Sequence, residues 1–346
     1  MNKPANIREV ARRAGVSITT VSRALNGYPD VNEETRKRIM AITEEIGYIP
    51  NAVAKSLVTQ ESRSFGFILS GLIRGSKHTI IQECLCGIYA FAREVGYEVT
   101  MFPVDSAMQL KKSYMQFSRE HNLAGVILQG IRTDDEYSRE VFSSDLPCVL
   151  IDIPADRNRV GSVSIDNEAA SAAMTDYLLS QGHRNIAFVN GKEAAAVSTQ
   201  RYEGYVSAMR GASAPLRWDY VLNGEFDEEI AYREALRFLP EHPEVTAAYC
   251  ASDLMAIGVM RAAAELGIAV PEQLSVTGFD DIPIAAYTTP SLTTIQQDFF
   301  LNGYEAARML YDIIQGKDVP HRKKTPHRLL ERNSAGSIQG GSPLRT

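Results

Sequence analysis

Cysteine and long apolar runs are scarce in this sequence of 346 residues. The four cysteines are Cys84, Cys86, Cys148 and Cys250. Their spacing does not match a zinc knuckle, so we expect small buried hydrophobic residues instead of disulfides or metal ligands. No segment reaches the roughly 18 consecutive apolar residues of a membrane span, and the opening residues MNKPANIREVARR hold no apolar core of signal-peptide length. These absences predict a cytoplasmic protein that does not contact a membrane.

Sequence motifs of the common enzyme classes are also missing. There is no H-E-x-x-H, no G-x-S-x-G and no dinucleotide-binding G-x-G-x-x-G pattern. The segment GLIRGSK at residues 71–77 differs in spacing from a phosphate-binding loop, and His78 occupies the position of the required hydroxyl residue. The six histidines show no metal-ligand spacing. We therefore expect neither enzymatic activity nor a metal or other cofactor.

Charge is unevenly distributed along the chain. The net charge is −6, yet the first 60 residues contain nine Lys or Arg and six Asp or Glu, which leaves +3 there and −9 in the remainder. A small basic segment ahead of a large acidic body is typical of a protein that contacts a polyanion through one domain. The length indicates two or three globular domains.

Three short helices are predicted within residues 1–50. Residues 7–14 place apolar side chains at helical spacing, with Asn6 as a cap and Gly15 as a left-handed stop. A second helix begins after Ser17 and ends near Asn26. A third helix follows the segment PDVN. Two short helices joined by a glycine-containing turn and braced by a third form a helix-turn-helix.

The outward face of the second helix carries side chains suited to DNA. In a helix-turn-helix, residues near the N-terminus of this helix meet base edges in the major groove. Thr19, Arg23 and Asn26 share that face. Arg23 can pair with guanine through two hydrogen bonds, and an exposed Ile18 can pack on a thymine methyl group. The hydroxyl groups expected to contact phosphates, near the positive helix end, belong to Ser17, Thr20 and Ser22.

Residues 51–61 have the pattern of a short hinge helix. Asn51 can cap the segment AVAKSL, whose length falls well below the roughly 12–15 residues that an isolated helix needs. This helix is therefore expected to form only against a partner, and an ordinary linker is the alternative. An apolar side chain such as Leu57 can insert between base pairs in the minor groove. We count Asn51, Lys55 and Leu57 among the expected DNA contacts.

From Phe65 onward, short apolar runs such as FGFIL, GVILQ and CVLID alternate with helical segments. This alternation predicts parallel α/β sheets, and about 260 residues suffice for two lobes between which the chain crosses more than once. Small ligands bind such folds beyond the carboxyl ends of the strands. The residues expected there are Asp152, Ser252, Asp253, Asp280 and Asp281, with Arg201 at the start of a helix.

Carboxylates and a planar guanidinium suit the vicinal hydroxyls of a sugar. We expect Arg201 and Asp280 to contact a ligand, and Asp253 and Asp281 to brace loops.

The run IREVARRAGVSITTVSRALNG…VNEETRKRIMAITEEIGYIPNAVAKSL closely resembles the headpiece and hinge of the lactose-repressor/purine-repressor (LacI/GalR) family of bacterial transcription regulators. The resemblance implies that Ile18, Thr19 and Arg23 occupy base-reading positions. It also implies that Leu57 is the hinge leucine inserted at the centre of a palindromic operator, which a twofold homodimer would bind.

Residues 62–333 resemble the family's effector-binding core, which is similar to periplasmic sugar-binding proteins. The motifs IDNEAA, QGHRNIAFVNG and LSVTGFDDIPIAAYTTPSLTTIQQD carry this likeness. The resemblance implies these effector positions: Gln129, Asp152, Val197, Arg201, Ser252, Asp280, Gln297 and Phe299. Two features depart from the family pattern. Residues 70–83 replace the usual stretch after the first strand, and Ala195 stands where purine-binding members place an arginine.

The expected organisation is a headpiece at residues 1–50, a hinge at 51–61, a core at 62–333 and a disordered Gly/Ser-rich tail at 334–346 without a tetramerising coiled coil. Within the core, lobe 1 is expected at about 62–163 and 293–325, and lobe 2 at about 164–292.

The function expected from these features is a dimeric repressor of carbohydrate-utilisation genes that a sugar inducer releases from its operator. One alternative is control by a corepressor, a phosphorylated metabolite or a partner protein, with Arg74, Lys77 and Lys192 as candidate phosphate ligands. Another is a sugar-binding protein without a DNA role, which the basic first segment disfavours.

Overall fold

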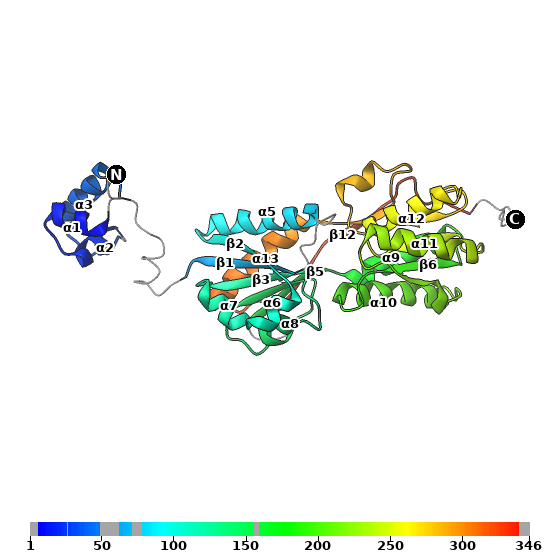
Figure 1. The fold of residues 1–346 in the computed structure, drawn as a ribbon, viewed down its shortest axis with the longest axis horizontal. Helices are drawn as coiled ribbons and strands as arrows, with labels where there is room; N and C mark the ends of the chain where they lie inside the picture. The colour runs from blue at the N-terminus through cyan, green and yellow to red at the C-terminus, as the bar shows by residue number, and fades with distance from the viewer. Residues whose placement is uncertain (1–5, 26, 49–61, 71–77, 156–158, 339–346) are drawn as a thin grey trace. The chain divides into compact units, whose positions relative to one another are not determined.

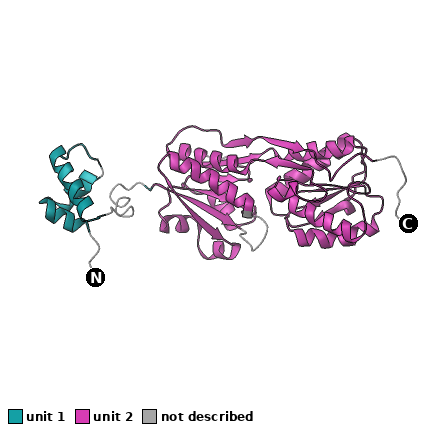
Figure 2. Cartoon of the chain, turned by 90° about the horizontal axis from the view of Figure 1, so that it is seen from above, with its two compact units in different colours: residues 1–62 teal, residues 63–346 magenta. Residues whose placement is uncertain are grey.

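The computed structural model describes residues 6–25, 27–48, 62–70, 78–155 and 159–338. The chain divides into two compact units, residues 1–62 and residues 63–346, drawn in different colours in Figure 2. None of the helices in these described ranges is long and apolar enough to cross a membrane.

The first unit consists of α1 (Ile7–Ala14), α2 (Ile18–Leu25) and α3 (Glu33–Glu45). The caps expected from the sequence are present: the Asn6 side chain accepts a hydrogen bond from the Glu9 amide, and Gly15 has a φ of 64°. Side chains from all three helices and the α2–α3 turn meet in one core, whose buried members are Val10, Ala11, Ala14, Val21, Ala24, Val31 and Ile39. This arrangement is the helix-turn-helix that the sequence predicts.

The second unit begins with a six-stranded parallel sheet. Its strands are β1 (Ser64–Ser70), β2 (Glu98–Val104), β3 (Gly125–Gln129), β4 (Cys148–Ile151), β5 (Val160–Ile165) and β11 (Arg322–Thr325). They lie in the order β11-β5-β4-β3-β1-β2. The inner strands β3 and β4 are apolar at nearly every position because helices cover both faces of the sheet.

The helices that cover this sheet form two layers. Helices α5 (His78–Glu94) and α13 (Phe299–Ile314) share one hydrophobic cluster with one face of the sheet. On the other side, visible below β1 and β3 in Figure 1, are α6 (Ser106–Lys111), α7 (Tyr114–Glu120) and α8 (Glu136–Val141).

A second parallel sheet has the order β7-β6-β8-β9. Its strands are β6 (Ile186–Asn190), β7 (Val221–Asn223), β8 (Ala247–Cys250) and β9 (Ser275–Thr277). Its helices are α9 (Asn167–Ser180), α10 (Ala196–Gly211), α11 (Glu228–Glu241) and α12 (Asp253–Glu265), with 3-10 turns η1 (Trp218–Tyr220) and η2 (Pro283–Ala286). One continuous hydrophobic cluster joins these elements.

The chain passes between the two sheets three times. The first passage joins β5 to α9, and the other two run through β10 (Thr294–Gln297) and β12 (His327–Leu330), which pair with each other in antiparallel fashion. The two-lobed parallel architecture predicted from the alternating pattern is thus confirmed.

The C-terminal segment departs from the expected disorder. Ser334 and Ala335 are buried, and the Ser334 hydroxyl donates to the Val276 carbonyl oxygen at 2.6 Å. The Ile338 amide donates to the Gln181 carbonyl oxygen at 3.0 Å. The prediction that the disordered tail begins at residue 334 is therefore wrong for residues 334–338, because this segment satisfies the backbone groups of the edge strand β9. Residues 339–346 lie outside the described ranges.

Candidate DNA-binding surface and ligand pocket

Helix α2 presents its expected reading face to solvent. Ile18 retains 45% of its surface, although a large apolar side chain normally packs inward. Thr19 and Arg23 are also exposed. The Ser17 hydroxyl accepts a hydrogen bond from the Thr20 amide at 3.0 Å, so Ser17 caps the helix.

Further expected DNA contacts differ in exposure or lie outside the structure. Thr20 and Ser22 are half-buried. Asn26 and the hinge residues Asn51, Lys55 and Leu57 lie outside the described residues. Sequence reasoning missed Asp30, whose carboxylate oxygen lies 2.6 Å from the Arg23 guanidinium.

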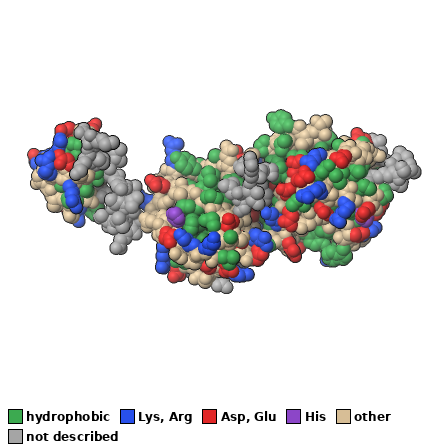
Figure 3. Space-filling model, viewed as in Figure 1, with side chains coloured by type: hydrophobic (Ala, Val, Ile, Leu, Met, Phe, Trp, Pro, Cys, Tyr) green, Lys and Arg blue, Asp and Glu red, His purple; other side chains and the backbone are tan. Residues whose placement is uncertain are grey.

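The larger unit does not present one sign of charge. On the face drawn in Figure 3, acidic, basic and apolar side chains are interspersed over this unit. Several polar residues at the carboxyl ends of its strands line a cavity.

This cavity has a volume of about 380 Å³. The structure brings all eight expected effector residues to its wall: Gln129, Asp152, Val197, Arg201, Ser252, Asp280, Gln297 and Phe299. Strand ends place most of them. Gln129 ends β3 and Gln297 ends β10, while Asp152 follows β4 directly. Parallel strands end at the same edge of a sheet, which brings Gln129 and Asp152 together. Gln297 reaches the same wall from β10, one of the segments that pass between the two sheets.

Arg201 is the centre of the polar wall and is only 3% exposed. Its Nε donates to the Asn167 side-chain oxygen at 2.9 Å, and one terminal nitrogen donates to the Ala251 carbonyl oxygen at 2.6 Å. The same nitrogen lies 3.5 Å from the Asp280 carboxylate. The guanidinium also covers the Phe279 ring, 3.7 Å from its centroid. These contacts hold the guanidinium in one orientation.

A chain of hydrogen bonds connects Arg201 to the first lobe. Asn167 donates from its amide nitrogen to the Ser164 hydroxyl at 3.0 Å, and Ser164 donates to Asp152 at 2.6 Å. Burial raises the pKa of Asp152, although the Ser164 hydrogen bond and the Arg201 charge act in the opposite direction. Asp152 and Asp280 both have positive φ, 66° and 113°. Such backbone strain outside glycine is typical of functional sites.

Two side-chain amide oxygens in the pocket, those of Gln129 and Gln297, accept no hydrogen bond from the described residues. Gln297 donates from Nε2 to the Asp280 carboxylate at 2.7 Å. A carboxylate accepts only, so this bond fixes the amide with Oε1 on the other side. Within the described part of the chain, the buried Oε1 atoms of Gln297 and Gln129 have no hydrogen-bond partner. The pocket therefore offers these two acceptors to a ligand.

Asp253 and Asp281 make bracing contacts, as the sequence analysis expects. Asp253 accepts from the Thr294 hydroxyl at 2.5 Å and from the Ile282 amide at 2.8 Å. Burial, with the nearby charge of Asp280, raises the pKa of Asp253 well above its ordinary value. Asp281 pairs with Arg332 at 2.6 Å and lies outside the pocket wall.

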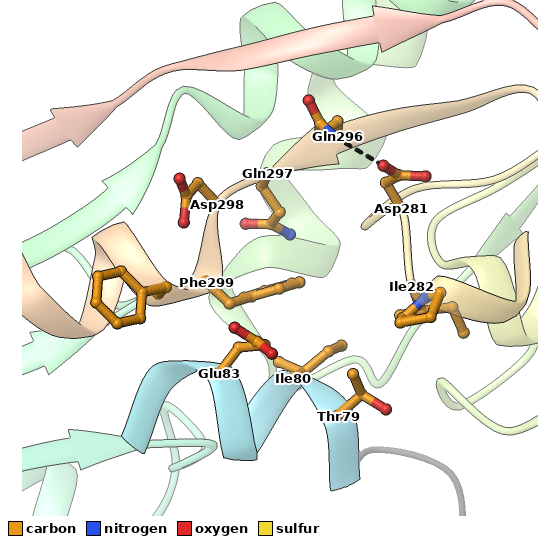
Figure 4. Close-up of a pocket in the computed structure, with 11 residues that line it drawn as sticks. Thr79, Ile80, Glu83, Asp281, Ile282, Gln296, Gln297, Asp298 and Phe299 are labelled. Carbon is orange, nitrogen blue, oxygen red and sulfur yellow. Dashed lines mark hydrogen bonds between the residues drawn. The ribbon is translucent and has the colours of Figure 1, made fainter. Parts of the chain in front are cut away.

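A second cavity of about 330 Å³ adjoins the first and shares Ile80, Gln297 and Phe299 with it. Figure 4 shows Glu83 from α5 and Asp298 from the start of α13 on its wall, with Asp281 hydrogen-bonded to Gln296. Asp281 thus faces this side cavity.

The remaining wall of the main pocket combines apolar side chains that are not predicted from the sequence with two residues that the sequence analysis singles out, Lys192 and Ala195. Its apolar part includes Ile80, Phe226 and Leu254. Ile80 belongs to the segment that departs from the family pattern, whereas Phe226 lies in a turn before α11 that carries no periodic signal. Residues 71–77, including Arg74 and Lys77, lie outside the described ranges.

Comparison with known proteins agrees with both parts of this geometry. The model of bacterial regulatory proteins of the lacI family matches residues 6–51, and a periplasmic binding protein-like domain matches residues 175–335. The chain is 31% identical over 319 residues to the probable HTH-type transcriptional repressor ExuR of Bacillus subtilis (strain 168), covering 92% of this chain and 94% of that protein. It is 30% identical over 321 residues to the HTH-type transcriptional repressor PurR of Vibrio parahaemolyticus, with the same shares covered.

Solved structures give the same result. The lac repressor dimer bound to operator and an anti-inducer superposes with a TM-score of 0.84 at 27% identity, covering 97% of this chain and 100% of that one. The complex of the regulator CelR with cellobiose superposes with a TM-score of 0.70 at 26% identity, covering 96% of this chain and 100% of the CelR chain. These relatives are regulators and not enzymes. The chain belongs to the lacI family of bacterial regulatory proteins and is a DNA-binding transcriptional repressor with an effector-binding domain.

Proposed function

We propose that this repressor binds a palindromic operator as a dimer in the cytoplasm and that a sugar inducer releases it. Each headpiece reads one half-site through α2, with Ile18, Thr19 and Arg23 at the bases. The hinge, with Asn51, Lys55 and Leu57, folds on the DNA and widens the minor groove at the centre. The similarity to a lac repressor dimer bound to its operator supports this arrangement.

The observation that carries the sugar assignment is the acceptor-rich pocket. The free Oε1 atoms of Gln129 and Gln297 lie in the same wall as the carboxylates of Asp152 and Asp280. A ligand with several hydroxyl donors satisfies such a wall, and Phe299 and Phe226 provide apolar surfaces for the carbon face of a sugar ring. The complex of CelR, a relative in structure, with cellobiose is consistent with this ligand class.

Regulation by the ligand follows from the distribution of the polar pocket residues over both lobes. The series of side-chain hydrogen bonds from Asp152 through Ser164 and Asn167 to Arg201 joins strands of the first sheet to helices of the second. A sugar that contacts both ends favours one arrangement of the lobes over others. A preference of about 1.4 kcal/mol for the arrangement that does not bind DNA weakens operator binding tenfold.

The direct test is a gel-shift assay on the promoter DNA that flanks the repressor's own gene, at fixed salt, with a panel of mono- and disaccharides. We expect a sequence-specific shift that one sugar releases. The variant Gln129→Met keeps the shape of the side chain but removes its acceptor, so it should still bind DNA while resisting release. Gln116→Met, on the exposed face of α7, is the matched control and should respond like the natural protein.

A shift that no sugar releases would reject the inducer assignment and leave the DNA role standing. A shift that requires an added compound would indicate a corepressor instead.

A phosphorylated metabolite is the second candidate ligand, favoured by the presence of Lys192 in the pocket wall. Lysine binds phosphate as a point charge. If the natural effector carries a phosphate, Lys192→Ala should weaken its binding strongly. The natural protein and Lys192→Ala should then bind the same ligand without its phosphate with equal affinity. Equal affinity of both proteins for a phosphorylated effector would exclude Lys192 from this role.

A further inference from the structure

The turn between α2 and α3 holds a carboxylate against the proposed base-reading arginine. The Arg23 guanidinium nitrogen lies 2.6 Å from the Asp30 carboxylate oxygen, and its central carbon lies 4.8 Å from the centroid of the Tyr28 ring. The Arg23 and Asp30 side chains retain 44% and 52% of their surface. The ion pair therefore sits on the same exposed surface as the reading face of α2.

Arg36 of α3 fixes the turn that carries Asp30. Its guanidinium donates to the carbonyl oxygens of Ala24 at 3.0 Å, Tyr28 at 2.5 Å and Val31 at 3.5 Å. The Tyr28 amide donates in turn to the Arg23 carbonyl oxygen at 3.1 Å. Because one side chain binds both the end of α2 and the turn, the Asp30 carboxylate is held at a fixed place beside Arg23.

We propose that Asp30 is a specificity-determining residue that positions Arg23 for its base contact. This inference rests on the proposed function, in which Arg23 reads a base. An exposed arginine loses rotamer freedom when it binds, and an ion pair formed beforehand reduces that loss. Guanidinium has five N–H donors, so the edge turned away from Asp30 remains able to pair with guanine.

The carboxylate also acts against binding to arbitrary DNA. Sequence-independent affinity comes from cations near phosphates, and a negative charge on the binding surface reduces it. Asp30 thus raises affinity for the correct site through Arg23, whereas its charge lowers affinity for every duplex. The effect through Arg23 increases the ratio of specific to non-specific binding, and the effect of the charge limits non-specific binding in absolute terms.

A competing role makes the opposite prediction. If Asp30 only sequesters Arg23, then removing its charge frees the guanidinium and strengthens binding to every duplex. The two roles therefore differ in the sign of the change on the specific site.

The test uses the full chain and two probes at one salt concentration. One probe is the palindromic duplex that the natural protein selects from a random library, and the other is a random duplex of equal length. The variants are Asp30→Asn, Arg23→Ala and the double change. The control Glu45→Gln removes the carboxylate that lies 2.9 Å from Arg13, another exposed headpiece arginine. Circular dichroism of each variant verifies that the helices form.

We expect Asp30→Asn to weaken binding to the selected duplex about tenfold, within the range for loss of one base contact, and to maintain or strengthen binding to the random duplex. The double change should bind the selected duplex no more weakly than Arg23→Ala, since the favourable effect of Asp30 acts through Arg23 and its charge only opposes phosphate contacts. Asp30→Glu retains the charge and should recover part of the lost preference. Glu45→Gln should leave the preference unchanged.

Unchanged or tighter binding of Asp30→Asn to the selected duplex would overturn the inference, as would additive losses in the double change. If Arg23→Ala loses the selected duplex and Asp30→Asn does not, only the role of Asp30 is rejected. If Arg23→Ala binds the selected duplex normally, the base-reading assignment fails and the role of Asp30 fails with it.

Discussion

Arg201 places its guanidinium between the Phe279 ring, at 3.7 Å from the centroid, and the Asp280 carboxylate, at 3.5 Å. Asp280 in turn holds the Gln297 amide, which turns a free oxygen towards the ligand space. The orientation of the Gln297 acceptor thus depends on one buried cation. This dependence joins the stability of the second lobe to ligand recognition.

Removal of Arg201 should therefore destabilise the protein as well as abolish ligand binding. Arg201→Ala leaves the Asp280 carboxylate without its buried counter-ion and removes the donor to the side-chain oxygen of Asn167. The free energy of unfolding should therefore fall by about 3–5 kcal/mol. Urea denaturation followed by circular dichroism measures this change. Arg210→Ala removes an exposed arginine from the same helix and should change the free energy by no more than about 0.5 kcal/mol. Equal stability of the two variants would contradict the role of Arg201.

Asp152 should make stability depend on pH. Burial raises its pKa, so the folded chain binds this proton more tightly than the unfolded chain does. Its contribution is therefore most favourable below the ordinary aspartate pKa of about 3.9, and folding becomes less favourable as the pH rises from there to the raised value. Asp152→Asn removes this penalty. Its free energy of unfolding should increase relative to the natural protein as the pH rises above about 4, the ordinary range of an aspartate.

Urea titrations at several pH values test this expectation. Asp176→Asn, at an exposed position of α9, is the control for the loss of one charge. A difference between Asp152→Asn and the natural protein that stays constant with pH would contradict the account.

Gly303 should be intolerant of a side chain. At this position α13 lies so close to α5 that a Cβ atom would come within 2.0 Å of the Cys84 carbonyl oxygen. Gly303→Ala must push the helices apart, and we expect a loss of about 1–3 kcal/mol in the free energy of unfolding. Because α13 begins at Phe299 in the pocket wall, ligand affinity should fall too. Gly211→Ala, in open space at the end of α10, should be neutral or slightly stabilising.

The C-terminal segment should contribute to stability as far as residue 338. Ser334 donates to the Val276 carbonyl oxygen and accepts from the Thr293 amide at 2.9 Å. Ser334→Ala leaves both buried groups unsatisfied and should reduce the free energy of unfolding by about 1–3 kcal/mol. The exposed Ser337→Ala is the matched control. A chain ending at residue 338 should melt like the full chain, whereas one ending at residue 333 should melt at a lower temperature.

The sequence predicts those parts of the site that depend on strand ends and helix faces. Gln129 and Asp152 come at or just after short apolar runs, and parallel topology brings such positions to one edge of the first sheet. Gln297 ends the antiparallel strand β10 and is expected only from the family resemblance. The reading face of α2 follows from helical spacing and caps alone. These features are local, so the chain near each residue is sufficient to infer them.

Other contacts depend on tertiary geometry that no local pattern records. Asp30 meets Arg23 across a turn that Arg36 of α3 braces, and Phe226 joins the pocket from an irregular turn. The ordered segment after residue 333 has the composition of a linker, but it is fixed by the free edge of β9. In each case, the contact joins residues from different elements, so the pattern around one residue does not reveal it.

The order of the strands also bears on synthesis at the ribosome. The first sheet includes β11, and helix α13, which covers this sheet, comes just before β11 in the chain. Both elements therefore leave the ribosome after every strand of the second sheet. The second lobe can therefore collapse while the first still exposes the part of one apolar face that α13, beside α5, will cover. Although it begins first, the N-terminal lobe is completed late, and a nascent chain stalled before residue 299 would present that uncovered face to chaperones.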